Sequence, residues 1–529
     1  MSDATNTLIV NETRSRPVAG QAVGVLISIA MPILLLAALW GHQINVDTAW
    51  YLVATRDWLD GARLYVDLFE INPPLNFYLT VPPILLSDLI GISAPNAQYV
   101  VLCLAIFLSL LGCQQMIPSA PEMPESRRNF FLFGLGIALI APAMNDVGQR
   151  EHVMVILTAP WLVSLLPRHR PLPLGNRLLL AAIAALGICL KPYFVLIPAA
   201  VTLWLVVSSR SLRPILSAGN LVMLSVGVSY LAAVYILHPE YYQDVIPLAR
   251  DVYGAIGFLD DRVFGYFAII TSPFILFSIV LLLGRSIPEG TGLFASAVLA
   301  GVGLYFTQWK GFNYHTVPLE AFALAACFWV LSRSHRVTAI AATVTIGILG
   351  SGFWDYYQGM YRNPAMGFPQ RVVNAGLQPQ SVTSLSTHVF SGPPIALDLG
   401  ADWGSRYAHL WPIPGALNAL SDMDCSTNPE RCAQYHAVLD HTRQSVIADL
   451  KVTRPDMLIL DRDNPYITDT DFTWDDFMRN DPAWQTVMDD YRLAMIDSTY
   501  DVWIRCTQPT AAYAKKCGAL SNESLPQPQ

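Results

Sequence analysis

Charged residues are scarce in this chain. Asp, Glu, Lys and Arg make up 14% of its 529 residues, whereas 53% are hydrophobic. A soluble globular protein carries about 25% charged residues, so this composition argues against an ordinary soluble enzyme. The sequence also lacks a Walker phosphate loop, a GxGxxG motif, a CxxC pair and zinc-finger spacing. We therefore expect no nucleotide cofactor and no nucleic-acid partner.

Long apolar runs are abundant. The run over residues 22–40 is by itself long enough to cross a bilayer as a helix. The polar residues before it include Arg14 and Arg16 and have no small-residue cleavage site, which predicts a retained signal anchor. Similar runs cover residues 97–116, 129–144, 153–166, 178–190, 193–209, 219–237, 263–283, 291–306, 316–331 and 337–353. The sequence predicts a polytopic α-helical membrane protein with about 11 transmembrane helices.

Arginine-rich loops alternate with acidic ones along the chain. The arginine-rich loops are expected to stay in the cytoplasm by the positive-inside rule. This predicts a cytoplasmic N-terminus and an outer C-terminus. The expected location is the inner (plasma) membrane of a bacterium, with the C-terminal domain in the periplasm. The arginine-rich loops cover residues 124–128, 167–177, 208–214, 283–286 and 332–336.

The same alternation constrains the segment 73–92. A spanning helix there would move every later arginine-rich loop to the outer side, and Pro82-Pro83 interrupts it. We expect it to lie along or dip into the outer face, so that residues 42–96 form one outer loop with juxtamembrane helices. Two later membrane helices meet at Lys191-Pro192 and are expected to be short or broken.

The C-terminal third differs in composition from the rest. Residues 354–529 hold 13 Lys or Arg and 21 Asp or Glu, which accounts for the whole net charge of −8. They contain no long apolar run. We predict a transmembrane catalytic domain over 1–353 and a soluble extracytoplasmic α/β domain over 354–529. Within the latter, 454–461 and 494–506 are predicted as strands and 472–492 as a helix.

The eight cysteines fall into two groups of four. Those in apolar runs are expected to be small core residues, namely Cys103, Cys113, Cys189 and Cys327. The others lie in the outer domain, in a compartment that permits disulfides: Cys425, Cys432, Cys506 and Cys517. Short loops favour the pairs 425–432 and 506–517, and the other two connectivities stay open.

Ionisable residues gather at the predicted outer side of the membrane. Such groups are costly at membrane depth and usually mark a pathway or a polar site. A set of carboxylates and cations at one face suits a site that activates a hydroxyl and holds a phosphate. Its members are Asp47, Asp67 and Glu70 in the first outer loop, Asp146, Arg150, Glu151 and His152 in the second, and Lys191, Lys310, Tyr314 and His315 further on.

Three stretches carry a resemblance to a known superfamily. They are DGARLYVDLFEINPPL (60–75), GICLKPYFVLIP (187–198) and QWKGFNYHTVPL (308–319). Over about residues 40–320 the chain resembles the GT-C glycosyltransferases, in particular the branch with protein O-mannosyltransferases and lipid A aminoarabinose transferases. It departs from that branch at Thr48, where an acid is usual, and at the GQREH stretch of the second loop. These departures leave the substrate open.

The resemblance implies sugar transfer from a polyprenyl-phosphate donor, outside the cytoplasm and with inversion. The acceptor hydroxyl needs a general base, for which Asp47 is the first candidate and Glu151 the second. A lipid phosphate is a good leaving group that needs no general acid, only cations that stabilise its negative charge. We assign that role to Lys191, Lys310, Arg150 and His315. Expected substrate contacts are Asp67, Glu70, Asp146, His152, Tyr51, Tyr65 and Tyr314. No metal ligands are assigned, the metal requirement stays open, and the acceptor is a glycan, a lipid or a protein.

Each assignment has a structural alternative. Asp47 could cap a juxtamembrane helix, and Arg150 could pair with Glu151 or Asp146. Lys191 and Lys310 could extend to the membrane interface without binding a substrate. The alternative functions are a lipid-linked sugar transporter or flippase and a non-catalytic factor for envelope glycan assembly.

Overall fold

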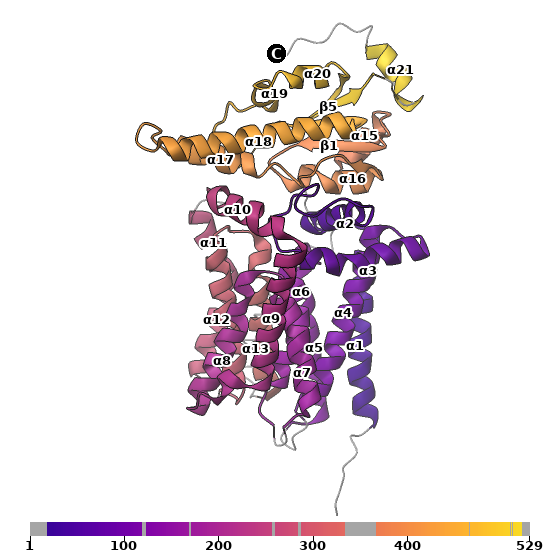
Figure 1. Ribbon diagram of the computed structural model, residues 1–529. Coiled ribbons are helices and arrows are strands. Elements are labelled where there is room, and N and C mark those ends of the chain that lie inside the picture. The colour runs from indigo at the N-terminus through magenta and orange to yellow at the C-terminus, as the bar shows by residue number, and fades with distance from the viewer. Residues whose placement is uncertain are drawn as a thin grey trace, which may run out of the picture.

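The computed structural model of the chain consists of a long helix bundle with an α/β domain on one end (Figure 1). It describes residues 18–118, 123–168, 171–255, 260–283, 287–333, 365, 367–464, 466–507, 509 and 511–520. The predicted boundary between 353 and 354 lies outside these residues. The last apolar run, 337–353, also lies outside them.

The predicted membrane helices form the bundle. Every other apolar run named above coincides with a helix of the described chain, and seven helical segments there are long and apolar enough to cross a membrane. The chain is therefore a multi-pass membrane protein. The bundle helices are α1 (Val18–Leu39), α4 (Ala94–Met116), α5 (Glu125–Ile140), α6 (Arg150–Ser164), α7 (Leu174–Ile188), α8 (Leu196–Ser209), α9 (Ala218–Leu237), α11 (Asp260–Leu283), α12 (Thr291–Gln308) and α13 (Val317–Arg333).

Two helices lie across one end of the bundle. They are α2 (Val46–Leu59) and α3 (Leu75–Ile90), and Figure 1 shows α3 running crosswise to α1 and α4. Pro82 and Pro83 lie inside α3. The segment 73–92 thus lies across the bundle end and does not continue along the bundle.

Short helices interrupt the chain where the bundle helices end. At the predicted break, α7 ends at Ile188 and η2 (Pro192–Val195) precedes α8. Lys191 is the extended residue before η2. The other interruptions in the bundle are η1 (Ala141–Asp146), η3 (Arg213–Leu216), η4 (Tyr241–Val245), α10 (Ile246–Val252), η5 (Tyr253–Ala255) and η6 (Asn313–Thr316).

The C-terminal domain is built on a mixed five-stranded sheet of order β2-β1-β3-β5-β4. β1 pairs in parallel with β2 and β3, and β5 pairs antiparallel with β3 and β4. The strands are β1 (Ser381–Leu385), β2 (Asp402–Trp403), β3 (Met457–Asp461), β4 (Tyr491–Ile496) and β5 (Tyr500–Arg505). The helices are α15 (Phe368–Asn374), η7 (Val389–Ser391), α16 (Pro393–Leu399), α17 (Pro412–Ser421), α18 (Pro429–Thr453), α19 (Trp474–Met478), α20 (Ala483–Met488) and α21 (Ala511–Leu520).

Two predictions within this domain need correction. The segment 494–506 is not one strand, because a turn at Asp497 and Ser498 folds it into the hairpin of β4 and β5. The segment 472–492 is not one helix, since it breaks between α19 and α20 just before Pro482. Proline has no amide hydrogen and restricts the residue before it, so the break has a local cause. The strand predicted over 454–461 is confirmed as β3.

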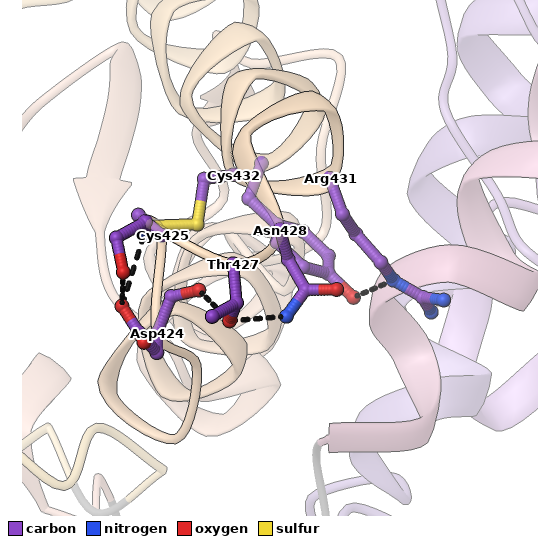
Figure 2. Close-up of a disulfide and its surroundings, with 8 residues drawn as sticks. Asp424, Cys425, Thr427, Asn428, Arg431 and Cys432 are labelled. Atoms are coloured by element: carbon purple, nitrogen blue, oxygen red, sulfur yellow. Dashed lines mark hydrogen bonds between the residues drawn. A yellow bond between two sulfur atoms is a disulfide. The ribbon is translucent and has the colours of Figure 1, made fainter.

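Both short-loop disulfides are present, joining Cys425 to Cys432 and Cys506 to Cys517. Figure 2 shows the first one at the start of α18, next to the Asp424 turn. Arg431, which directly precedes Cys432, donates its Nε to the hydroxyl of Tyr435 about one turn further along α18, and that hydroxyl donates to the Asp251 carbonyl of α10. The disulfide therefore braces a point where the domain meets the bundle.

The domain and the first loop share one hydrophobic core. Trp50 and Tyr51 of α2 belong to the same buried cluster as Val382 of β1 and Ile459 of β3. The Phe69 amide donates to the Arg406 carbonyl at 2.7 Å. In Figure 1, α16 lies directly over α2, which it contacts. The sheet is thereby fixed over the end of the bundle.

Candidate active site

A cavity of about 480 Å³ lies between the bundle end and the C-terminal domain. Its floor comes from the start of α2, the η1–α6 turn, and the segments around η5 and η6. Its roof comes from the loops that follow β1 and β2 and from Tyr466 after β3. Segments from distant parts of the sequence, including residues 69–72 of the first loop, thus line one space.

Asp47 lies in the first turn of α2 and lines the cavity. The residue that caps this helix is Asn45, whose Oδ1 accepts from the amides of Asp47 and Thr48. The Asn45 amide group also donates to the Asp146 carboxylate at 3.2 Å, which ties α2 to the end of η1. Because Asn45 caps the helix, the carboxylate of Asp47 is available to the cavity.

The Asp47 carboxylate receives two hydrogen bonds, both on Oδ2. Gln149 Nε2 donates at 2.9 Å and Arg150 Nη2 donates at 3.2 Å. Among the described residues nothing donates to Oδ1. The turn before α6 packs closely against α2 at Gly148. This glycine has a φ of +87°, and a Cβ there would meet the Thr48 hydroxyl at 3.1 Å.

Arg150 is buried and connects three side chains of the first loop. Its Nη1 donates to the Tyr51 hydroxyl at 2.8 Å and lies 3.9 Å from Glu70 Oε1. Glu70 in turn accepts from Trp50 Nε1 at 2.8 Å. Among the described residues, Arg150 is the only Lys or Arg that lines the cavity.

Glu151 and Lys191 form a second ion pair, away from the cavity wall. Lys191 Nζ donates to Glu151 Oε1 at 2.6 Å and to Gln308 Oε1 at 3.3 Å. Glu151 is 0% exposed, and its Oε2 has no hydrogen-bond partner within the described chain. Lys191 Nζ lies 5.0 Å from the ring centre of Tyr314, a cavity residue. The sequence predicted a base at Glu151, but this geometry suits a positioning role.

Lys310 and His315 also lie outside the cavity wall. Lys310 Nζ donates to the Tyr253 carbonyl at 2.5 Å and lies over the Tyr253 ring. Burial lowers the pKa of Lys310 from 10.5 to about 8. His315 is buried against Phe312 and Tyr314, and its Nδ1 has no hydrogen-bond partner among the described residues. Tyr253, Phe312 and Tyr314 do line the cavity, so both groups adjoin its wall.

Three predicted substrate contacts lie elsewhere. His152 is buried and its ring bonds the Leu139 carbonyl at 2.7 Å. Tyr65 is buried, and its hydroxyl donates to the Asn72 carbonyl. Asp67 is half-exposed and pairs with Arg63. These contacts give all three a role in holding the loops, and none of the three lines the cavity.

Six of the predicted site residues line the cavity. Asp47, Tyr51, Glu70, Asp146, Arg150 and Tyr314 all line the same cavity. Sequence reasoning missed Asn45 and Gln149, although both lie beside predicted residues. Within the described part of the chain, no group of three or more His, Cys, Asp or Glu side chains is placed to hold a metal ion.

The roof residues were also missed. His388 and His409 face the cavity from the C-terminal domain. Burial lowers the pKa of each histidine from 6.5 to about 4, so both are neutral at physiological pH. Neither residue lies in a motif, and only the folding of the domain over the bundle brings them near Asp47.

Comparison with solved structures decides the fold. The chain is similar to ArnT from Cupriavidus metallidurans bound to undecaprenyl phosphate, with 13% identity, a TM-score of 0.52, and coverage of 93% of this chain and 98% of that chain. The chain has the GT-C fold. The apo state of the same ArnT gives 13% identity, a TM-score of 0.50 and coverage of 92% and 97%. The GT-C match extends beyond residues 40–320, so it includes the C-terminal domain. No protein-family model and no curated protein sequence matches the chain.

Proposed function

We propose that this protein is a membrane glycosyltransferase that moves a sugar from a polyprenyl-phosphate donor to an acceptor outside the cytoplasm. One observation carries the proposal: a carboxylate held by an arginine and a glutamine lines a cavity at one end of a GT-C bundle. The resemblance of the first loop and the fold support the same reaction. The solved ArnT that shares this fold was bound to undecaprenyl phosphate.

Asp47 is the proposed general base. Its Oδ1 takes the proton of the acceptor hydroxyl while that oxygen forms a bond to the anomeric carbon. The bond from this carbon to the phosphate oxygen breaks on the opposite face, so the configuration inverts. Polyprenyl phosphate leaves with the electron pair. The two hydrogen bonds to Oδ2 fix the orientation of the carboxylate before the reaction.

Arg150 is the proposed principal cation for the leaving phosphate. The sequence left open that Arg150 is neutralised by Glu151 or Asp146. In the structure Glu151 forms its ion pair with Lys191 instead. Arg150 pairs with Asp47 and lines the cavity beside it. Lys310 lies outside the cavity wall, where its Nζ donates to the Tyr253 carbonyl. A planar guanidinium offers two parallel donors to a phosphate, which suits this role.

Retention of undecaprenyl phosphate tests the donor class. Wild-type protein in nanodiscs is expected to bind undecaprenyl phosphate in native mass spectrometry, and Arg150→Met to lose most of that binding. Arg63→Met is the matched control, because Arg63 belongs to the same loop region but pairs with Asp67 at the surface. Equal binding by wild type and Arg150→Met would contradict this assignment. No binding by wild type would contradict the donor class.

A further inference from the structure

The roof of the cavity is made of flat rings without charge. The His388 ring lies 4.9 Å from Tyr466 and 5.3 Å from Phe390, between ring centres. Trp411 stacks on Phe69 of the first loop, with ring centres 6.0 Å apart. Flat rings of this kind offer apolar surface together with polar edges. A sugar ring presents the matching surfaces, a C–H face and a rim of hydroxyls.

The charges on the cavity wall disfavour an anionic acceptor. Asp47 and Glu70 line the floor, and both lie beside Arg150, the only Lys or Arg on the wall among the described residues. The roof contributes no Asp, Glu, Lys or Arg among the described residues. If the donor phosphate pairs with Arg150, a second phosphate on the acceptor would enter a cavity that already holds two carboxylates and would have no cation left to pair with. Burying an unpaired charge is strongly unfavourable.

The roof is also held in place before any ligand binds. Asp461, at the end of β3, accepts from Ser386 Oγ at 2.6 Å and from Ser391 Oγ at 2.8 Å. These two serines flank the loop that carries His388. A loop fixed in advance loses little entropy on binding, which favours recognition of a weakly binding ligand.

One buried polar atom in the roof lacks a partner. His409 lines the cavity, and its Nδ1 has no hydrogen-bond partner among the described residues. An unsatisfied buried polar atom costs free energy, and most such atoms in proteins are paired. A ligand hydroxyl is a suitable partner, because it can both donate and accept.

We infer that the acceptor is an uncharged saccharide and that the roof of the C-terminal domain is its binding subsite. The inference rests on the proposed function and narrows it. The acceptor sugar packs against the rings of His388, Phe390 and Tyr466 and presents a hydroxyl to Asp47 on the floor. The C-terminal domain thus selects the acceptor, while the bundle holds the donor.

Saturation-transfer NMR on the full-length protein in nanodiscs tests the subsite. The probes are maltotriose, mannotriose and galactotriose, together with maltotriose that carries a terminal phosphate. At least one neutral trisaccharide is expected to bind more tightly than the phosphorylated probe. His388→Ala is expected to weaken that binding about tenfold, the size expected when an aromatic contact and a polar edge are lost. His388→Phe keeps a flat ring and is expected to retain most of the affinity.

His436→Ala is the matched control, since His436 is an exposed histidine on α18 of the same domain. All three variants are expected to bind undecaprenyl phosphate as wild type does. Tighter binding of the phosphorylated probe, or equal binding by His388→Ala, overturns the subsite. If no neutral trisaccharide binds while undecaprenyl phosphate does, the inference fails and the proposed function stands. If trisaccharide binding depends on His388 but undecaprenyl phosphate does not bind, the subsite stands and the donor assignment fails.

Discussion

Two ion pairs at the same end of the bundle have different surroundings. Arg150 and Asp47 meet at the wall of the cavity, where the Asp47 side chain is 24% exposed. Glu151 and Lys191 meet in the interior, at 0% and 4% side-chain exposure. Neighbouring residues of one helix therefore serve two purposes. The first pair lies where a ligand in the cavity can reach it, whereas the second lies away from the cavity wall.

The largest effect is expected for Asp47→Asn. The amide keeps the shape of the side chain but cannot take a proton, so transfer is expected to fall about 10²- to 10⁴-fold. Donor binding is expected to persist. The measurement is release of polyprenyl phosphate from its glycosylated form in vesicles, with Asp67→Asn as the surface control. Equal losses of donor binding and transfer would assign Asp47 a structural role.

Glu151→Gln is expected to act on stability. It leaves Lys191 without its counter-charge in the interior, and breaking a buried ion pair costs about 3 to 5 kcal/mol. Thermal unfolding in detergent measures the loss. The double variant Glu151→Gln with Lys191→Met is expected to recover much of it, because no buried charge remains. A fully stable Glu151→Gln protein without transfer activity would instead place Glu151 in the reaction.

Arg150→Lys is expected to have an intermediate effect. Arginine contacts Asp47 and the Tyr51 hydroxyl with two different nitrogens, whereas the single ammonium group of lysine cannot replace both contacts. We expect about a tenfold loss of transfer with the folded structure retained. An unchanged rate would mean that only the charge matters at this position.

The smallest effect concerns pH. The pKa of Lys310 is lowered to about 8, so its charge is lost as the pH rises through 8. Undecaprenyl phosphate affinity is therefore expected to fall a few-fold between about pH 7 and 9, and Lys310→Arg to remove this dependence. Unfolding does not explain the fall. The unfolded chain keeps this proton up to about 10.5, so Lys310 favours the folded state increasingly from pH 8 to 10.5. A pH-independent affinity in the wild type would exclude Lys310 from the phosphate site.

Local patterns predicted the membrane helices well, because apolar runs of sufficient length have few alternatives. The alternation of arginine-rich loops predicted that segment 73–92 does not span, and α3 lies crosswise to α1 and α4 (Figure 1). The partners of the charged side chains in ion pairs were harder to predict. Arg150 and Glu151 are adjacent, and successive residues of a helix point about 100° apart, so one step along the chain separates the cavity wall from the interior.

The roof could not be predicted from local patterns at all. His388 and His409 lie in loops between strands, with no motif or periodicity around them. Their position depends on how a sheet formed by distant segments docks on the first loop. Asp47, in contrast, was chosen because it lies in the same outer loop as the DGARLYVDLFEINPPL stretch (60–75), although its hydrogen-bond partners Gln149 and Arg150 are about a hundred positions away.

The tie between Arg406 and the first loop also bears on how the protein is made. Arg406 Nη1 donates to the Val66 carbonyl, two residues that are 340 positions apart. At the usual rate of protein synthesis, the first loop waits some tens of seconds for this partner to leave the ribosome. A nascent chain that stops earlier has the bundle and Asp47 but no enclosing wall around them. Folding of the C-terminal domain is therefore the step that completes the cavity around Asp47.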